Sequence, residues 1–191
     1  KLLPSIFSSG VTQINILVGT IIASFQASAV SYLYYADRIY QINLAIAGIA
    51  VSTVSLPVLS NALKSKKFSK VSNIQNKSIE LSLLLSLPAS LGLILASEEI
   101  VSGLFGYGSF TPNDVEITSL ALEFFGYGIV AFALVKILAN FFFARDNTKT
   151  PFYISSIIVF TNILLSIIFF GQIGFLIIPI ATSISSWLGV L

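Results

Sequence analysis

The most unusual chemistry in this chain is the dipeptide Asp37-Arg38, which lies between two long stretches without a charged residue. These stretches cover residues 2–36 and 39–63. An ionisable side chain inside a membrane span costs roughly 2.5 to 3.5 kcal/mol on insertion scales, so it usually faces the interior of a bundle or a water-filled cavity. Arg38 and Asp37 are therefore the first candidates for a substrate-binding site in a chain this apolar.

The surroundings of the pair leave two interpretations open. From an expected helix start near residue 29, Arg38 lies about 13 Å along the helix at 1.5 Å per residue, which favours a cavity-facing side chain. A structural ion pair or an anchor at the membrane interface is the alternative, because amphipathic rings are typical of the interface. Four such rings surround the pair, namely Tyr32, Tyr34, Tyr35 and Tyr40.

A second isolated charge is Lys136, which lies between the uncharged stretches 124–135 and 137–144. It either lines a pathway for an anionic substrate or reaches toward the cytoplasmic interface, where Arg145 follows on the same expected helix. Lys77 and Glu80 are three residues apart, a spacing that predicts a surface ion pair on one helix face.

Enzymatic chemistry is not expected. The chain has no cysteine and no histidine, so thiolate and the usual zinc ligands are absent, and its acids are scattered singly. We therefore predict no catalytic site, no metal and no cofactor. The glycine-rich segment 103–108 follows no strand, so we interpret it as a flexible outer loop and not as a phosphate-binding loop. A net charge of +2 also argues against a nucleic-acid partner.

The composition identifies a polytopic membrane protein. Only 9% of the residues are charged, 55% are hydrophobic and the mean hydropathy is +0.94, whereas soluble domains carry about 25% charged residues. The apolar runs are long enough for spanning helices and too long for the strands of a membrane barrel. The predicted fold is all-α, a bundle of about six transmembrane helices near residues 5–25, 29–62, 73–96, 112–144, 151–170 and 174–191.

Several residues predict where these helices begin or bend. Thr111-Pro112-Asn113-Asp114 offers a capping hydroxyl, a proline at the first helical position and a carboxylate at the third. Thr150-Pro151 repeats this start more simply. A proline inside a span removes a backbone hydrogen bond and should kink or break its helix. Three prolines lie in such positions, Pro57, Pro88 and Pro179.

The distribution of lysine and arginine predicts the orientation. Basic residues are enriched in cytoplasmic connections. The connection carrying Lys64, Lys66, Lys67, Lys70 and Lys77 should therefore be cytoplasmic, and the next connection carries Glu98 and Glu99 without a base. By alternation, the turn with Arg145 and Lys149 shares the cytoplasmic face.

The chain contains no methionine, even at position 1. We therefore expect it to be an internal piece of a longer protein, and no signal peptide is recognisable in it.

Several short motifs follow one another along most of the chain. They are residues 10–15 (GVTQIN), 22–24 (IAS), 31–38 (SYLYYADR), 48–53 (GIAVST), 56–60 (LPVLS), 108–115 (GSFTPNDV), 135–138 (VKIL), 143–146 (FARD) and 148–151 (TKTP). In this order the motifs resemble the second half of the bacterial lipid II flippases of the MurJ (MviN) family.

This resemblance implies a fold of two six-helix bundles around a central cavity, of which residues 1–191 resemble the C-terminal lobe, helices seven to twelve, without the N-terminal lobe. The seventh helix of the family leaves the cytoplasm, in agreement with the lysine-based orientation. The motif at residues 34–38 implies that Arg38 lines a cationic cavity and binds the diphosphate of a lipid-linked substrate, since a guanidinium holds phosphate oxygens in a bidentate fork. Asp37 would hold or neutralise Arg38 when the cavity is empty.

Two positions depart from the family pattern. Asn140 replaces a usual proline, and the segment 142–145 replaces a more typical phenylalanine-tyrosine version. Neither touches the cavity motif. The other cavity arginines of the family belong to the first bundle, so we expect no transport by this piece alone.

The resulting hypothesis is part of a flippase that carries the lipid-linked peptidoglycan precursor across the bacterial inner membrane by alternating access. Its expected partners are that diphosphate lipid, the membrane lipids and the N-terminal lobe of the same protein. Another exporter of the same superfamily is the first alternative, although a cation exporter should show carboxylates in its cavity. A non-transporting membrane scaffold that recruits partners through its lysine-rich connection is the second.

Overall fold

The computed structural model describes the backbone of residues 2–191 and the side chains of residues 13–191. Within that part the structure is helical and contains no strand, which confirms the predicted all-α fold. The elements in chain order are α1 (Leu2–Ala23), α2 (Ala29–Leu44), the π-helical segment η1 (Ala45–Ala50), α3 (Val51–Lys64), α4 (Phe68–Leu95), α5 (Ser97–Phe105), α6 (Pro112–Gly126), α7 (Ile129–Phe143), α8 (Lys149–Ile173), the 3-10 turn η2 (Gly174–Leu176) and α9 (Ile177–Val190).

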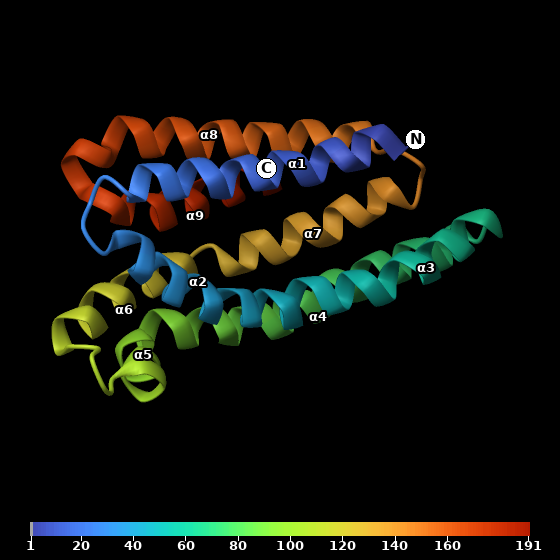
Figure 1. Cartoon of the computed structure of the whole chain (residues 1–191). Coiled ribbons are helices and arrows are strands. Elements are labelled where there is room, and N and C mark those ends of the chain that lie inside the picture. Colours follow the sequence, from blue (N-terminus) through green and yellow to red (C-terminus); the bar gives the residue numbers. More distant parts are fainter. Residues whose placement is uncertain (1) are drawn as a thin grey trace.

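Helices occupy all six ranges expected to span the membrane. Judged by length and composition, three described stretches can cross a bilayer, Ala29–Lys64, Phe68–Leu95 and Lys149–Val190. Helices α6 and α7 are bent by 41° and make a fourth if they are counted as one span. The third stretch contains α8 and α9, which pack side by side after the chain turns at Gly174 (Figure 1).

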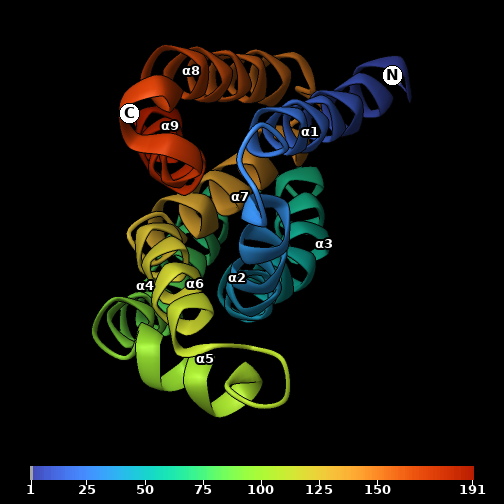
Figure 2. The same ribbon diagram turned by 60° about the vertical axis from the view of Figure 1, so that its left-hand side comes forward.

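Two groups of helices share one central helix (Figure 2). Helix α1 packs on α8, and α8 packs on α9. Helices α2 and α3 pack with α4 and α6, while α7 lies between the groups and contacts both α4 and α9. The connections after α3 and after α7 lie at the same end of the bundle, as predicted for the two basic turns, and α5 lies at the opposite end (Figure 1).

The interruptions of the long helices do not lie at the prolines. Helix α3 continues through Pro57, α4 continues through Pro88, and Pro179 is in the first turn of α9, where a missing N–H is tolerated. No break lies at any of the three prolines, so that part of the prediction was wrong, whereas a kink at these positions stays a prediction. The helices are instead interrupted at η1 and between α6 and α7, at Tyr127 and Gly128.

Neighbouring helices donate hydrogen bonds to backbone carbonyls at both interruptions. Ser82 Oγ of α4 donates to the Ala47 carbonyl in η1 at 3.0 Å. At the second interruption, Ser90 Oγ donates to the Gly126 carbonyl at 2.8 Å and Trp187 Nε1 donates to the Tyr127 carbonyl at 2.9 Å. A non-α-helical backbone at membrane depth is tolerated where the surrounding protein satisfies its polar groups, so these donors explain the positions of the interruptions.

The connection between α4 and α6 is more ordered than the sequence suggested. Its residues 97–105 form helix α5, so the prediction of a loop over residues 103–108 was wrong for residues 103–105. Glu98 and Glu99 lie in the first turn of α5, where acidic side chains are favourable because they complement the helix dipole.

One of the two predicted helix starts has the expected chemistry. At the start of α6, Thr111 Oγ1 accepts the Asp114 N–H at 3.2 Å, and Asp114 Oδ2 accepts the Thr111 N–H at 2.7 Å. This reciprocal capping box confirms the first start. At α8, however, the N-cap residue is Thr148, and Thr150 lies inside the helix with its N–H donated to Asn147 Oδ1 at 3.1 Å, so the start predicted at Thr150 was wrong.

We expect Thr111→Ala to lower the free energy of unfolding by about 1 kcal/mol, because the N–H of Asp114 loses its acceptor. The matched control is Thr148→Ala, since Thr148 precedes α8 without a side-chain capping bond. Thermal unfolding of the full-length protein in detergent measures both. Equal losses of unfolding free energy in the two variants would show that the capping box does not stabilise the protein.

Candidate functional site

Helix α2 places Arg38 on the face opposite to its packed side. Ala36, Ile39 and Tyr40 are buried, and the Tyr40 ring stacks on Phe125 with centroids 4.9 Å apart. Arg38 itself is exposed. The spacing of buried and exposed positions thus turns the guanidinium away from the core of the lobe.

The guanidinium of Arg38 rests on an aromatic ring of its own helix. Its Cζ atom lies 4.6 Å from the centroid of Tyr34, one turn earlier. Such a cation–π contact favours one position of the cation without occupying its hydrogen-bond donors. Arg38 therefore remains able to bind an anion with its N–H groups.

Asp37 has a different partner. Its side chain is half-buried, and its Oδ2 accepts a hydrogen bond from Gln41 Nε2, one turn along the helix. Among the described side chains, no ion pair joins Asp37 to Arg38. Neutralisation of Arg38 by Asp37 in an empty cavity stays a prediction.

The tyrosines near the pair hold the start of α2 against the end of the bundle. Tyr32 Oη donates to Asp114 Oδ1 at 2.7 Å. The Tyr35 ring lies 4.8 Å from the Phe105 ring and 5.4 Å from the Phe110 ring, measured between centroids. Sequence reasoning missed these contacts, since the partners lie far along the chain and no local pattern connects them.

Lys136 is an exposed residue on the otherwise well-packed helix α7. Four residues later, the buried Asn140 donates through Nδ2 to the carbonyl and to Oγ of Ser52, both at 2.6 Å. Four residues earlier, Phe132 meets the Tyr40 ring edge-on at 6.0 Å. Lys136 therefore lies on a stretch of α7 whose neighbouring turns pack against α2 and α3, and both interpretations of its role stay open.

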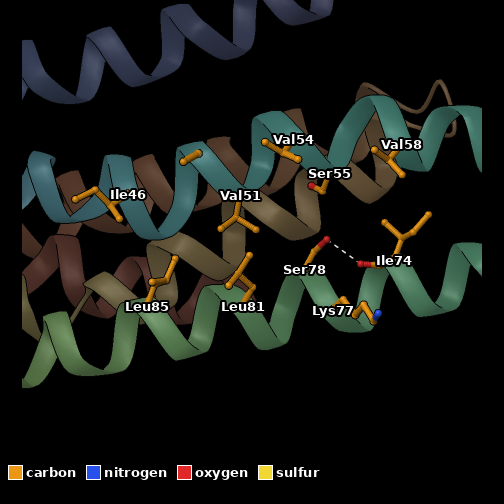
Figure 3. A pocket seen from close by; sticks show the side chains of 11 residues that line it. Ile46, Val51, Val54, Ser55, Val58, Ile74, Lys77, Ser78, Leu81 and Leu85 are labelled. Carbon is orange, nitrogen blue, oxygen red and sulfur yellow. Dashed lines mark hydrogen bonds between the residues drawn. The ribbon is translucent and has the colours of Figure 1, made fainter.

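A groove of about 490 Å³ runs between the η1–α3 segment and α4 (Figure 3). Sequence reasoning did not identify it. The available signal was the four-residue spacing of Ile46, Ala50, Val54 and Val58, which all line the groove. Its other lining residues are Val51, Ser55, Ile74, Lys77, Ser78, Leu81 and Leu85.

Within the part of the chain that the structure describes, no three acidic, histidine or cysteine side chains gather into a group that could hold a metal ion. The candidate site therefore consists of a cation with an aromatic support and a nearby carboxylate, and an apolar groove begins about two helical turns later, at Ile46. Such a set of groups is suited to binding an amphiphilic anion and offers no nucleophile paired with a base.

A family model described as lipid II flippase MurJ matches residues 1–191. Among curated proteins, the chain is 41% identical over 189 residues to the probable lipid II flippase MurJ of Rhizobium meliloti strain 1021, which covers 99% of this chain and 35% of that protein. It is 40% identical over 184 residues to the protein of the same name from Rickettsia prowazekii strain Madrid E, covering 96% of this chain and 36% of that protein.

Two solved structures extend the comparison. A lipid II flippase MurJ in an inward closed conformation superposes with a TM-score of 0.89 at 32% identity, covering 98% of this chain and 40% of that chain. An outward-facing multidrug transporter of the MATE family superposes with a TM-score of 0.83 at 16% identity, covering 98% of this chain and 41% of that chain, which shows the shared fold alone. The chain spans about a third of the length of its curated relatives.

Proposed function

The chain belongs to the lipid II flippase MurJ family, and from this premise we propose that it forms the C-terminal six-helix lobe of a flippase. The complete protein would move lipid II from the inner to the outer leaflet of the bacterial cytoplasmic membrane by alternating access. It would cross that membrane several times, with the lysine-rich turn between α3 and α4 in the cytoplasm. The N-terminal lobe of the same protein would complete the cavity.

The observation that carries this proposal is the exposed guanidinium of Arg38, which with Asp37 interrupts a long uncharged stretch of the chain. Arg38 points away from the packed side of α2 and is supported by Tyr34. A diphosphate offers oxygens that a guanidinium binds through two parallel charged hydrogen bonds. In a cavity from which bulk water is partly excluded, such bonds are stronger than at a protein surface.

Asp37 would neutralise the charge of Arg38 when no substrate is bound. Its carboxylate accepts a hydrogen bond from Gln41 and, among the described side chains, makes no ion pair with Arg38. When the substrate leaves, Asp37 would give up Gln41 and Arg38 would leave the Tyr34 ring, so that new rotamers of both side chains form the ion pair. The arginine would then keep a counter-ion in both states, which limits the cost of its burial.

Growth of a bacterium depleted of its own lipid II flippase tests the proposal. We expect expression of the full-length parent protein to restore growth and the exposure of lipid II on the outer leaflet. The parent with residues 1–191 removed is the matched control and should restore neither. Failure of a well-expressed, membrane-inserted parent would contradict the flippase function and favour an exporter of another substrate.

A further inference from the structure

Glu123 of α6 is a carboxylate inside a largely uncharged part of the chain. Residues 117–122 before it and residues 124–135 after it carry no charge. Measured along the helices at 1.5 Å per residue, Glu123 lies about 16 Å from the first residue of α6 and about 30 Å from the last residue of α7. A hydrocarbon core about 30 Å thick that is centred on this pair of helices therefore contains Glu123.

No cation pairs with this carboxylate among the side chains that the structure describes. Glu123 is half-buried and accepts a hydrogen bond from Tyr127, whose Oη lies 3.2 Å from Glu123 Oε1. Burial in the membrane favours the neutral, protonated carboxyl, whereas a donor such as this phenol favours the ionised carboxylate. These opposing effects leave both protonation states of Glu123 accessible.

A second carboxylate lies on the same face of α6, nearer the outer end of the helix. Glu116 is exposed and precedes Glu123 by two helical turns, or about 10 Å. It lies about 6 Å along α6, near the outer boundary of the hydrocarbon core. Rows of acidic side chains in membrane helices carry protons in pumps and transporters. The exposed face of α6 thus offers a proton a route from the outer interface to Glu123.

Other ionisable residues lie on the elements that pack against α6, but no described hydrogen bond or ion pair joins any of them to Glu123. Helix α9 and the turn η2 contain none. Helix α4 carries its charges toward its other end, on Lys70, Lys77 and Glu80, and the predicted ion pair of Lys77 with Glu80 is not present there. The others are Glu98 and Glu99 of α5, and Tyr32, Tyr34, Tyr35, Asp37, Arg38 and Tyr40 of α2.

Tyr127 connects Glu123 to the junction of α6 and α7, where the two helices are bent by 41°. The Tyr127 N–H donates to the Glu123 carbonyl at 3.4 Å, and the Tyr127 carbonyl accepts Trp187 Nε1 of α9 at 2.9 Å. A hydrogen bond to an ionised carboxylate is stronger than one to a neutral carboxyl. A change of protonation at Glu123 therefore changes how firmly the Tyr127 side chain is held at the bend.

We propose that Glu123 binds and releases a proton from the outer side of the membrane, and that Tyr127 passes this change to the junction of α6 and α7. The proton moves between water at the outer interface and a carboxylate oxygen of Glu123, and no other bond is made or broken. The proton site stands without the function proposed above, whereas its coupling to lipid transport rests on that function.

Carbodiimide labelling of the full-length protein in phosphatidylethanolamine vesicles tests the proton site. Dicyclohexylcarbodiimide is apolar and adds to protonated carboxyls within the bilayer, whereas a water-soluble carbodiimide reaches carboxyls at the surface. Mass spectrometry measures the labelling of Glu123 over a range of pH. We expect the apolar reagent to label Glu123, about tenfold less for each pH unit once most of the carboxyl is ionised. The water-soluble reagent should label Glu98 and Glu99 instead.

Tyr127→Phe keeps the ring and removes the hydrogen-bond donor. Because the phenol stabilises the ionised carboxylate, its loss favours the protonated form, so the pH of half-maximal labelling should rise by about one unit. Tyr153→Phe is the matched control, since Tyr153 is 63% exposed on α8, and it should leave this pH unchanged.

Transport in the same vesicles tests the coupling. Acidification of the side that corresponds to the outer face should raise the transport rate of the parent severalfold. Glu123→Gln and Tyr127→Phe should lose most of this response, whereas Glu99→Gln, in the first turn of α5, should keep it.

Three outcomes would overturn the proposal. The first is a folded protein in which the apolar reagent leaves Glu123 unlabelled at every pH. The second is an unchanged labelling curve in Tyr127→Phe, and the third is a full response of Glu123→Gln to the pH gradient. Because labelling is measured without transport, a protein that shows pH-dependent labelling of Glu123 but moves no lipid would contradict the proposed flippase function and support the proton site.

Discussion

Replacing Arg38 by alanine in the full-length protein is expected to reduce the transport rate by about two orders of magnitude. The variant loses charged hydrogen bonds to a diphosphate, each of which contributes about 1.5 to 3 kcal/mol, and 1.4 kcal/mol corresponds to a factor of ten. Folding should be unaffected, because the guanidinium is exposed and rests on the face of the Tyr34 ring. Transport per folded protein in membrane vesicles measures the effect.

Arg38→Lys tests whether Arg38 acts through its positive charge or through the planar geometry of its guanidinium. An ammonium keeps the positive charge but cannot form the planar bidentate fork. We expect this variant to retain only a small part of the activity, while Lys149→Ala at the start of α8 should retain nearly all of it. Full activity of Arg38→Lys would remove the bidentate role, and full activity of Arg38→Ala would make Arg38 a structural residue.

The largest effect on stability is expected for Gly128→Leu at the junction of α6 and α7. A Cβ atom at this position would lie 2.6 Å from Ser183 Oγ and 3.0 Å from the backbone Cα of Ser183. Ser183 also donates to the Phe124 carbonyl at 2.5 Å, so it cannot move away without losing that bond. Overpacking of this kind costs typically 1 to 3 kcal/mol, to which the lost hydrogen bond adds.

Gly92→Leu is the matched control, because a Cβ atom at Gly92 meets nothing within 4 Å. The melting temperature of the full-length protein in detergent should fall by several degrees for Gly128→Leu and remain nearly unchanged for Gly92→Leu. A similar melting temperature for both variants would contradict the close contact between α6–α7 and α9.

The helical ranges were predictable because hydropathy is a local property of the chain. The interruptions were not, because they depend on donors from other helices. The prolines at positions 57 and 88 suggested breaks, yet the interruption in the first of these spans lies at η1, where Ser82 of α4 reaches the Ala47 carbonyl. A hydrogen bond between residues 35 apart leaves no pattern in a single sequence.

The candidate site was likewise predictable from the sequence only in part. An isolated charge is visible in the sequence, so Arg38 and Asp37 were identified, and their supports Tyr34 and Gln41 lie one helical turn away. The groove depends on the packing of α4 against α3. Its position could be found only when both helices were placed, although the row from Ile46 to Val58 was present in the sequence.

The most direct measurement follows a fluorescent lipid-linked diphosphate in vesicles that contain the purified full-length protein. With the labelled lipid in one leaflet, a membrane-impermeant quencher in the bulk solution reports its arrival in the other. The predicted result is transfer that is much faster with the full-length protein than in protein-free vesicles, and is lost in Arg38→Ala. Transfer at the protein-free rate, by a protein that is folded and inserted, would contradict the proposed flippase function.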